Sequence, residues 1–425
     1  MYPSVLLCAV YVVCISFAIY NWDVWSMADY SEEAAWLTFI AVGVFAVVGY
    51  LVDYFFFFKR KYVVGESTNP KNSIHEINVG LLFLWLNLIV CVVTVLWHLV
   101  EVRRIAGGAS NWFQMMSIYR AKASYGVLSE NERMPFILLQ MKKYVGVQGY
   151  LIAYILTNNI IARGIKRRDV LLIIPVLMMS IQVIVNAGRL EILQLFASIM
   201  ASAYILWHRK WGWNRNLSSK TVKIAFISLV SLLGVFYLSR GVVGRGGDFD
   251  LLYYVCIYVG GSIKLFDMYI KNPVAASPIW GKETFYTLNQ FLSKFGNGHD
   301  RYIRHLEFRY VGGLNVGNVY TAPRRYIQDF GVSGMILLVI VFSFFMTYMY
   351  CKVKYSKRRY ADYSLLLYCY LFSAIPMFPI DDIFFSSMIS TSYIVNILLM
   401  YILFVLIVYK PIKIKIDGRV ISGEG

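Results

Sequence analysis

Long apolar segments recur along the whole chain of 425 residues, and they constrain its fold more than any other feature. A helix of about 20 apolar residues crosses the ~30 Å hydrocarbon core of a bilayer. With 59% hydrophobic and 15% charged residues, the composition also lies outside the range of soluble globular proteins. The sequence therefore predicts an all-α polytopic integral membrane protein with about ten transmembrane helices, at residues 3–20, 35–57, 79–100, 145–162, 170–186, 190–207, 221–238, 333–350, 364–379 and 393–409.

Lysine and arginine collect in every second loop between these segments. Basic stretches lie at residues 59–61, 163–168, 208–215 and 352–359 and in the C-terminal tail. Because cytoplasmic loops are enriched in Lys and Arg, this pattern predicts that both termini are cytoplasmic. Much of the net charge of +17 is then a topology signal, and we expect no nucleic-acid partner.

The longest stretch outside the expected spans, residues 239–332, divides the chain into three parts. Residues 1–238 should hold helices 1 to 7, residues 239–332 a large loop on the outer side of the membrane with the elements of a candidate site, and residues 333–425 helices 8 to 10 with a basic cytoplasmic tail. Aromatic residues recur at roughly helical spacing within residues 249–270 of this loop, around Lys264 and Asp267. This pattern predicts an interfacial or re-entrant helix.

Arginines gather at the expected outer face although the positive-inside rule predicts few cations there. Arg189 lies in a short turn, Arg240 and Arg245 follow the seventh segment, and Arg324 and Arg325 precede the eighth. Arginine presents a rigid, charged fork that matches phosphate oxygens. The sequence thus predicts a site for a lipid-linked pyrophosphate, whose negative charge the arginines stabilise as it departs, without a metal or another cofactor. The loop lysines are expected to be solvated at the lipid surface instead, at positions Lys264, Lys271, Lys282 and Lys294.

A base for proton transfer is expected in the same loop. Asp329 is preferred, with pairing to Arg324 or Arg325 as its alternative role, and His305 has a pKa suited to the task. The other candidates are His299, Asp248, Asp250, Asp300 and Glu307. Asp381 and Asp382 would either hold sugar hydroxyls or mark the turn before the last span. The spacing of Asp248 and Asp250 is that of a metal-binding DxD pair, which we interpret as coincidence, so no metal site is expected.

The stretch GNVYTAPRRYIQDFGVSG at residues 317–334 resembles the Asn-x-Tyr-Thr…Arg…Asp-Phe-Gly…Gly signature of bacterial Wzy-type O-antigen polymerases. Further similarities are the AGR turn ending at Arg189, YVGGSIKLFDMYI at residues 258–270 and WGKETFYTL at residues 280–288. The resemblance covers most of the chain from about residue 150 onward. Pro323 precedes the motif arginine, where proline often follows it in the family, and this leaves open whether Arg324 or Arg325 acts.

This resemblance implies a GT-C-like membrane glycosyltransferase architecture in the bacterial inner membrane, with the active site on the periplasmic side. It implies transfer of a growing glycan from undecaprenyl pyrophosphate onto the non-reducing end of another lipid-linked repeat unit, in O-antigen or surface-polysaccharide biosynthesis. Membrane lipids, a chain-length regulator and a flippase are the further partners implied. The resemblance assigns substrate binding to Asn318, Tyr320, Thr321, Tyr326, Tyr258 and Glu283.

Two other functions compete with this interpretation. An O-antigen-type ligase would use the same donor and a different acceptor. A transporter of lipid-linked oligosaccharides would carry charges inside its spans, whereas the expected spans are nearly uncharged except near their ends, as at Asp53. We therefore rank the polymerase first, the ligase second and the transporter third.

Overall fold

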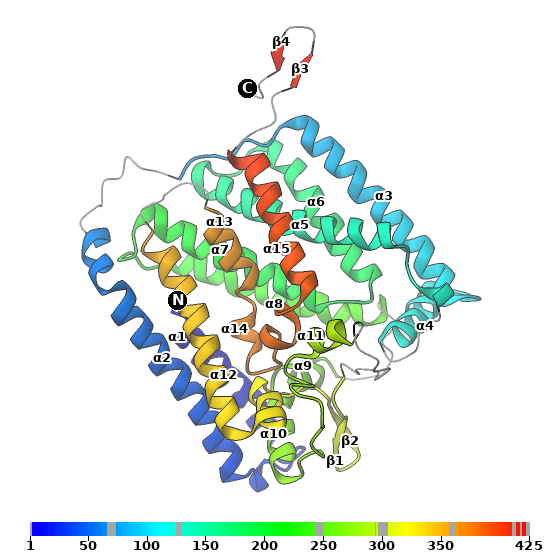
Figure 1. Cartoon of the computed structure of the whole chain (residues 1–425), viewed down its shortest axis with the longest axis vertical. Helices are drawn as coiled ribbons and strands as arrows, with labels where there is room; N and C mark the ends of the chain where they lie inside the picture. Colours follow the sequence, from blue (N-terminus) through cyan, green and yellow to red (C-terminus); the bar gives the residue numbers. More distant parts are fainter. Residues whose placement is uncertain are drawn as a thin grey trace. The chain divides into compact units, whose positions relative to one another are not determined.

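The computed structural model describes residues 2–65, 74–124, 130–242, 250–293, 295, 305–356, 362–409, 414–416 and 419–421. Most of these residues are helical, and their strands form only short hairpins (Figure 1). The chain divides into two compact units, which are described separately. Unit 1 comprises residues 1–67, 248–356 and 371–394, and unit 2 comprises residues 68–247, 357–370 and 395–425.

Nine helices of the described residues are long and apolar enough to cross a membrane. They cover nine of the expected segments, so the prediction of an all-α, multi-pass membrane protein is confirmed. In chain order they are α1 (Pro3–Tyr20), α2 (Glu32–Gly65), α3 (Leu81–Ala106), α5 (Phe136–Arg163), η3 with α6 (Arg167–Asp169 and Val170–Val185), α7 (Leu190–Trp211), α8 (Ser219–Val242), α12 (Ala322–Lys354) and α15 with η5 (Thr391–Phe404 and Val405–Tyr409).

The segment expected to cross at residues 364–379 is not one continuous helix. It forms α13 (Tyr363–Leu371) and the short α14 (Ala374–Met377), and a π-helical turn, η4 (Phe384–Met388), follows. Together α13 and α14 make an apolar helical stretch, Tyr363–Met377, that is shorter than the expected span. Its chain breaks instead into short pieces, and the last of them lead to Asp381 and Asp382.

The helix expected around residues 258–270 is present as a bent pair. Helices α9 (Leu251–Val259) and α10 (Gly261–Lys271) meet at an angle of 52°. Asp250 begins α9, because its carboxylate accepts hydrogen bonds from the backbone N–H groups of Leu252 (3.1 Å) and Tyr253 (3.3 Å). Lys264 is buried in α10 and its Nζ lies 3.0 Å from Asp267 Oδ2, so the expectation of a solvated lysine was wrong at this position. A buried ammonium needs such a partner.

Within unit 1, α2 and α12 pack side by side along most of their length (Figure 1). Ser343 Oγ donates a hydrogen bond to the carbonyl oxygen of Phe45 at 2.6 Å, and Gly49 faces Thr347 across the contact. Small residues let membrane helices approach closely, and a buried hydroxyl bond between helices adds to the packing. We call this contact of Phe45, Gly49, Ser343 and Thr347 the α2–α12 seam.

Helix α12 begins earlier than the expected eighth span, at Ala322 rather than near Ser333. Thr321 is extended before it and Pro323 lies in its first turn, a position where proline favours a helix start. Gly331 interrupts the helix with φ 67° and ψ −172°, a conformation that suits glycine. The motif residues 322–330 therefore form a short helical segment that is set off from the apolar span by this kink.

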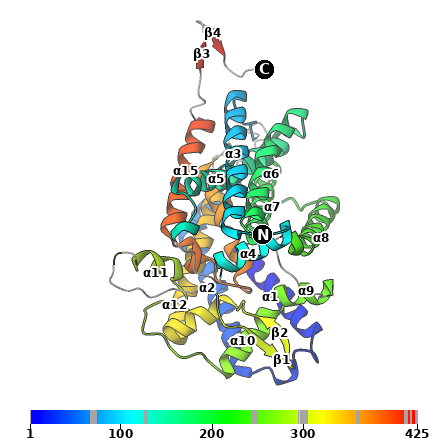
Figure 2. The ribbon, with the colours of Figure 1, turned by 90° about the vertical axis from the view of Figure 1, so that its right-hand side faces the viewer.

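Short elements complete unit 1 around this segment. The hairpin of β1 (Arg309–Val311) and β2 (Leu314–Gly317) is antiparallel and lies beside α10 (Figure 2). The remaining elements are η1 (Met27–Asp29) and α11 (Tyr286–Leu292). Segments far apart in the sequence thus surround the start of α12.

Unit 2 is built around α5, the most deeply buried of the candidate spans, which packs against α3, α6 and α7. It also contains α4 (Trp112–Ser124), η2 (Glu130–Glu132) and a terminal hairpin of β3 (Ile414–Ile416) and β4 (Arg419–Ile421). Helix α5 starts at Phe136 instead of residue 145, and Lys142 therefore lies within it. Lys142 Nζ is 3.0 Å from Nε2 of the buried His98, so this span is less free of charge than expected.

Candidate functional site

The first turns of α12 place both motif arginines inside unit 1. The backbone N–H of Ala322 donates to the carbonyl oxygen of Phe378 at 2.9 Å, which ties the start of α12 to the chain after α14. Arg324 and Arg325 are both buried, as are their motif neighbours Tyr320 and Tyr326. The sequence therefore identified a segment whose polar residues face the interior.

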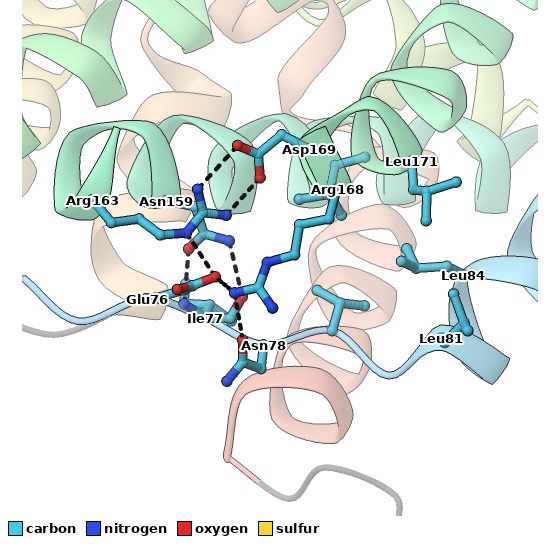
Figure 3. Close-up of a pocket in the computed structure, with 12 residues that line it drawn as sticks. Glu76, Ile77, Asn78, Leu81, Leu84, Asn159, Arg163, Arg168, Asp169 and Leu171 are labelled. Atoms are coloured by element: carbon cyan, nitrogen blue, oxygen red, sulfur yellow. Dashed lines mark hydrogen bonds and ion pairs between the residues drawn. The ribbon is translucent and has the colours of Figure 1, made fainter. Parts of the chain in front are cut away.

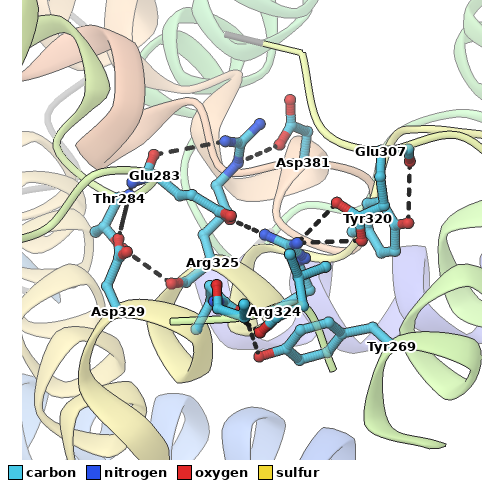
Figure 4. A network of polar contacts seen from close by, with 12 residues as sticks. Tyr269, Glu283, Thr284, Glu307, Tyr320, Arg324, Arg325, Asp329 and Asp381 are labelled. Atoms are coloured by element: carbon cyan, nitrogen blue, oxygen red, sulfur yellow. Dashed lines mark hydrogen bonds and ion pairs between the residues drawn. The ribbon is translucent and has the colours of Figure 1, made fainter. Parts of the chain in front are cut away.

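Arg324 lies between two glutamates and two tyrosine rings (Figure 4). Its Nη2 lies 2.9 Å from Glu307 Oε2, and its Nη1 pairs with Glu283 Oε2. The guanidinium carbon lies 4.7 Å from the centre of the Tyr269 ring and 5.0 Å from that of Tyr320. The side chain of Arg324 is 0% exposed, whereas those of Glu283 and Glu307 are 16% and 31% exposed. The glutamates thus cover a fully buried cation.

Arg325 has its own carboxylate partner. Its Nε donates to Asp381 Oδ1 at 3.0 Å, and its Nη1 approaches the carbonyl oxygen of Glu283 at 3.5 Å. The two neighbouring arginines therefore have separate counter-ions from different parts of the chain, and both contact Glu283 (Figure 4).

Asp329 anchors the segment that carries Glu283. Its Oδ2 accepts hydrogen bonds from the backbone N–H groups of Glu283 (3.0 Å) and Thr284 (2.7 Å). Thr284 Oγ1 in turn donates to the carbonyl oxygen of Arg325 at 3.2 Å. The sequence allowed for Asp329 as a base or as an arginine partner, and the structure gives it backbone partners that fix the position of Glu283.

Asp382 is a buried carboxylate surrounded by donors. It accepts from the backbone N–H groups of Phe384, Phe385 and Ser386 at 3.0 to 3.1 Å and from the hydroxyl of Tyr326 at 3.1 Å. Burial raises the pKa of Asp382 to about 7, while Arg325 and these hydrogen bonds oppose the rise. Asp382 therefore holds the turn η4 against α12 and titrates near neutrality.

Arg309 and the hairpin form a second layer that sequence reasoning did not single out. Arg309 Nε donates to the Tyr320 hydroxyl at 3.1 Å, and its Nη1 and Nη2 reach the carbonyl oxygens of Met268 (2.5 Å) and Asn272 (2.6 Å). The Tyr320 hydroxyl donates to the carbonyl oxygen of Glu307 at 3.1 Å. Burial raises the pKa of Tyr320 above its usual range, and the carboxylate of Glu307 adds to this rise. The pair of glycines between two short apolar runs, at residues 312–313, was the signal for this hairpin.

Acidic residues outnumber the arginines in this network. Arg309, Arg324 and Arg325 pair with the carboxylates of Glu283, Glu307 and Asp381. Asp329 and Asp382 join the same network through the backbone of Glu283 and the hydroxyl of Tyr326. The arginine charge is thus already balanced within unit 1. A phosphate that bound the Nη groups of Arg324 or the Nε of Arg325 would therefore have to replace a carboxylate.

Thr321 Oγ1 and Arg324 Nε are buried and have no hydrogen-bond partner within the described part of the chain. Arg324 Nη1 and Glu283 Oε2, also beside them, are partnered only by each other as an ion pair. Because buried polar atoms are nearly always paired, the two unpaired atoms are candidates for contact with a bound ligand. Asn318, by contrast, donates its side-chain N–H to the carbonyl oxygen of Leu306 at 3.3 Å.

The other predicted arginines belong to unit 2. Arg189 is buried, donates to the carbonyl oxygen of Phe236 at 2.8 Å and lies 4.1 Å from the centre of that residue's ring. Arg240 lies 4.3 Å from the ring of Tyr237 on its own helix. Arg245 lies outside the described residues. The expected convergence of all five arginines therefore stays a prediction.

The remaining predicted residues are placed as follows. His305 is half-buried, two residues before Glu307. Tyr258 lies on α9 with its ring centre 4.8 Å from that of Tyr254. The candidate bases Asp248, His299 and Asp300 lie outside the described residues. Within the described residues, no three His, Cys, Asp or Glu side chains are grouped so that they could hold a metal ion.

Comparisons of the chain with models of known protein families, with characterised proteins and with solved structures find no match. The polymerase interpretation therefore stays a prediction from the motif residues and their resemblance.

Proposed function

We propose that this chain is a membrane glycosyltransferase that polymerises oligosaccharide repeat units linked to undecaprenyl pyrophosphate. The observation that carries the proposal is the pair of buried arginines at the start of α12, beside the end of an apolar span. The pyrophosphate of a lipid-linked sugar lies at this level of a bilayer, with its tail in the hydrocarbon. In the predicted topology this end of α12 faces the periplasm.

The carboxylates around Arg324 give the proposal a mechanism. Glu307 is the more exposed of its two partners, and a phosphate presents oxygens to an arginine much as a carboxylate does. An arriving pyrophosphate replaces Glu307 at the guanidinium. Arg324 and Arg325 then stabilise the negative charge that develops on the leaving group.

The displaced glutamate supplies the base that the reaction needs. The acceptor hydroxyl oxygen forms a bond to the anomeric carbon, and the bond from that carbon to the pyrophosphate oxygen breaks with its electron pair. The hydroxyl proton passes to Glu307, or to Glu283. Asp329 acts here as a positioning residue, because it holds the backbone of Glu283. Arg189, Arg240 and Arg245 remain candidates for a second contact with phosphate.

One observation bears on the transporter, which ranks third after the ligase. Lys142 and the buried His98 form a titratable pair within unit 2, and Lys142 also donates to Asn186 at 2.9 Å. Ionisable groups inside membrane helices often mark translocation paths. The ligase differs from the polymerase only in its acceptor.

The test is polymerisation of a purified lipid-pyrophosphate-linked repeat unit in detergent, read as a ladder of products on a gel, with and without EDTA. We compare wild type with Arg324→Ala, Arg324→Lys and Glu307→Gln. Lys282→Ala is the matched control, because Lys282 is exposed and precedes Glu283. We expect ladders from wild type and Lys282→Ala and none from Arg324→Ala.

Three results would count against parts of this proposal. A full ladder from folded Arg324→Ala would remove the arginines from the mechanism. A ladder abolished by EDTA and restored by a divalent ion would refute metal independence. If folded wild type polymerises no repeat unit but transfers glycan to another lipid acceptor, the ligase is correct. Uptake of the lipid-linked oligosaccharide into vesicles without glycan transfer would identify a transporter.

A further inference from the structure

Unit 2 contains a pocket of about 390 Å³ that is remote in sequence from the arginines of α12 (Figure 3). It lies between the chain that leads into α3, the end of α5, the turn η3 and the start of α6. One wall is polar and includes Glu76, Asn159, Arg163 and Arg168. The opposite wall is apolar and includes Leu81, Leu84 and Leu171 (Figure 3).

The polar wall is fixed by hydrogen bonds to the backbone. Asn159 Oδ1 accepts from the N–H of Ile77 at 2.8 Å, and its Nδ2 donates to the carbonyl oxygen of Ile77 at 2.9 Å. Arg163 pairs with Asp169 through Nη2 (2.6 Å) and with Glu76 through Nε (2.7 Å). These contacts hold the chain before α3 against the end of α5, so the wall does not depend on a ligand for its shape.

Positive charge exceeds negative charge at the mouth of this pocket. Glu76 is paired with Arg163, Lys166 and Arg168, while Asp169 is paired with Arg163. Three cations thus pair with two carboxylates, and Arg167 beside them is a further cation. The side chains of Lys166 and Arg168 are 52% and 43% exposed, so the excess charge lies where a ligand can reach it.

The apolar wall continues into two candidate spans. Leu81 and Leu84 are one turn apart at the start of α3, and Leu171 is near the start of α6. Both helices present their N-terminal ends, which carry partial positive charge, to the same pocket. An anion bound here would therefore lie beside the apolar side chains of two candidate spans.

We propose that this pocket binds an anionic glycerophospholipid. The headgroup phosphate lies against Arg168, which lines the pocket, and against Lys166, whose Nζ lies 3.6 Å from the lining residue Glu76. One acyl chain lies along Leu81, Leu84 and Leu171. A zwitterionic lipid carries no net charge to match the excess cations, and free phosphate has no chain for the apolar wall. Basic pockets between membrane helices bind anionic headgroups in this way. In the predicted topology the pocket faces the cytoplasmic leaflet.

The experiment uses the full chain in dodecyl maltoside and measures binding of three probes by calorimetric titration. The probes are dioctanoyl phosphatidylglycerol, dioctanoyl phosphatidylcholine and sn-glycerol 3-phosphate. The variant carries Lys166→Ala with Arg168→Ala, and Lys220→Ala is the control, since Lys220 is an exposed cation of unit 2 that does not line the pocket. Lys166→Gln alone removes one exposed charge and is a second variant in case the double variant does not fold.

We expect phosphatidylglycerol to bind at least tenfold more tightly than either other probe. The double variant should weaken that binding about 25-fold, because each surface cation contributes roughly fivefold to anionic-lipid binding. Lys166→Gln should weaken it about fivefold, and Lys220→Ala should leave it unchanged. Equal binding of phosphatidylcholine, or binding untouched in both pocket variants, would overturn the proposal. Equally tight binding of glycerol phosphate would identify a free phosphate ligand and overturn the lipid assignment.

Discussion

Replacing Arg324 by alanine removes a buried guanidinium and leaves Glu283 and Glu307 without the cation between them. Removing one partner of a buried ion pair costs about 3–5 kcal/mol, because the remaining charge is buried and uncompensated. The glutamate side chains are 16% and 31% exposed, so water screens part of their repulsion. We therefore expect the free energy of unfolding to fall by about 3 kcal/mol, the lower end of that range.

The assay is equilibrium unfolding in mixed micelles of dodecyl maltoside and increasing SDS, followed by circular dichroism. A second variant, Glu307→Gln, and the double variant complete a thermodynamic cycle. If Arg324 and Glu307 interact as the 2.9 Å contact indicates, the double variant loses about 1–3 kcal/mol less than the sum of the single losses. Lys282→Ala should change stability by less than about 0.5 kcal/mol. Additive losses, or an Arg324→Ala variant as stable as Lys282→Ala, would refute the reasoning.

Three further predictions concern the surroundings of this site. Gly331→Ala should lower the free energy of unfolding by about 1 kcal/mol. Nothing lies within 4 Å of the added methyl group, so the cost comes from backbone strain at φ 67° and not from a clash. Gly43→Ala in mid-helix is the control and should not destabilise, and equal effects of the two substitutions would exclude strain. Asp382 has a pKa raised to about 7, so its protonated form favours the folded state: the stability it contributes is complete below the pKa of about 4 in the unfolded chain and is lost as pH rises through 7. Asp382→Asn should remove this fall in stability between pH 5 and pH 8, measured in the same micelles, and an unchanged slope would assign the titration to another group. Lys264→Ala removes the buried partner of Asp267 and should lower the free energy of unfolding by about 2–3 kcal/mol. Lys271→Ala removes the 37% exposed partner of the same Asp267 and should lower it by less than about 1 kcal/mol. The reverse order would contradict the argument from burial.

The helices could be predicted from the sequence wherever one apolar run spans the bilayer. At residues 364–379 the apolar helix is shorter than predicted, because the chain turns after Leu371 and again after Met377 although the apolar composition continues. A hydropathy window records composition and not the path of the backbone. The start of α5 was also expected too late, at residue 145, because the charged Lys142 precedes the apolar run although it belongs to the helix.

The sequence indicated several residues of the site, but it did not indicate which carboxylate pairs with which arginine. Arg324, Arg325 and Glu283 were identified from the motif and its resemblance, and Glu307 and Asp381 were noted only as separate acidic residues. That Glu283 and Glu307 meet at one guanidinium depends on the path of the loop between them, which no spacing rule specifies. Arg309 was passed over because loop cations usually have no defined partner. Its contacts depend on the packing of the hairpin against α10, which no local sequence pattern predicts.

The α2–α12 seam fixes where the start of α12, which carries the arginines, lies along the neighbouring helix α2. Ser343 and Thr347 lock α12 against α2 well inside the span, and Arg324 is carried on the far end of the same helix. A slip of one helical turn along the seam would move Arg324 by about 5.4 Å, more than the length of an ion pair. A lipid-linked pyrophosphate has its own height, fixed by a tail that cannot leave the hydrocarbon. If the chain acts as proposed, the packing of α2 against α12 therefore determines whether the guanidinium and the phosphate lie at the same depth.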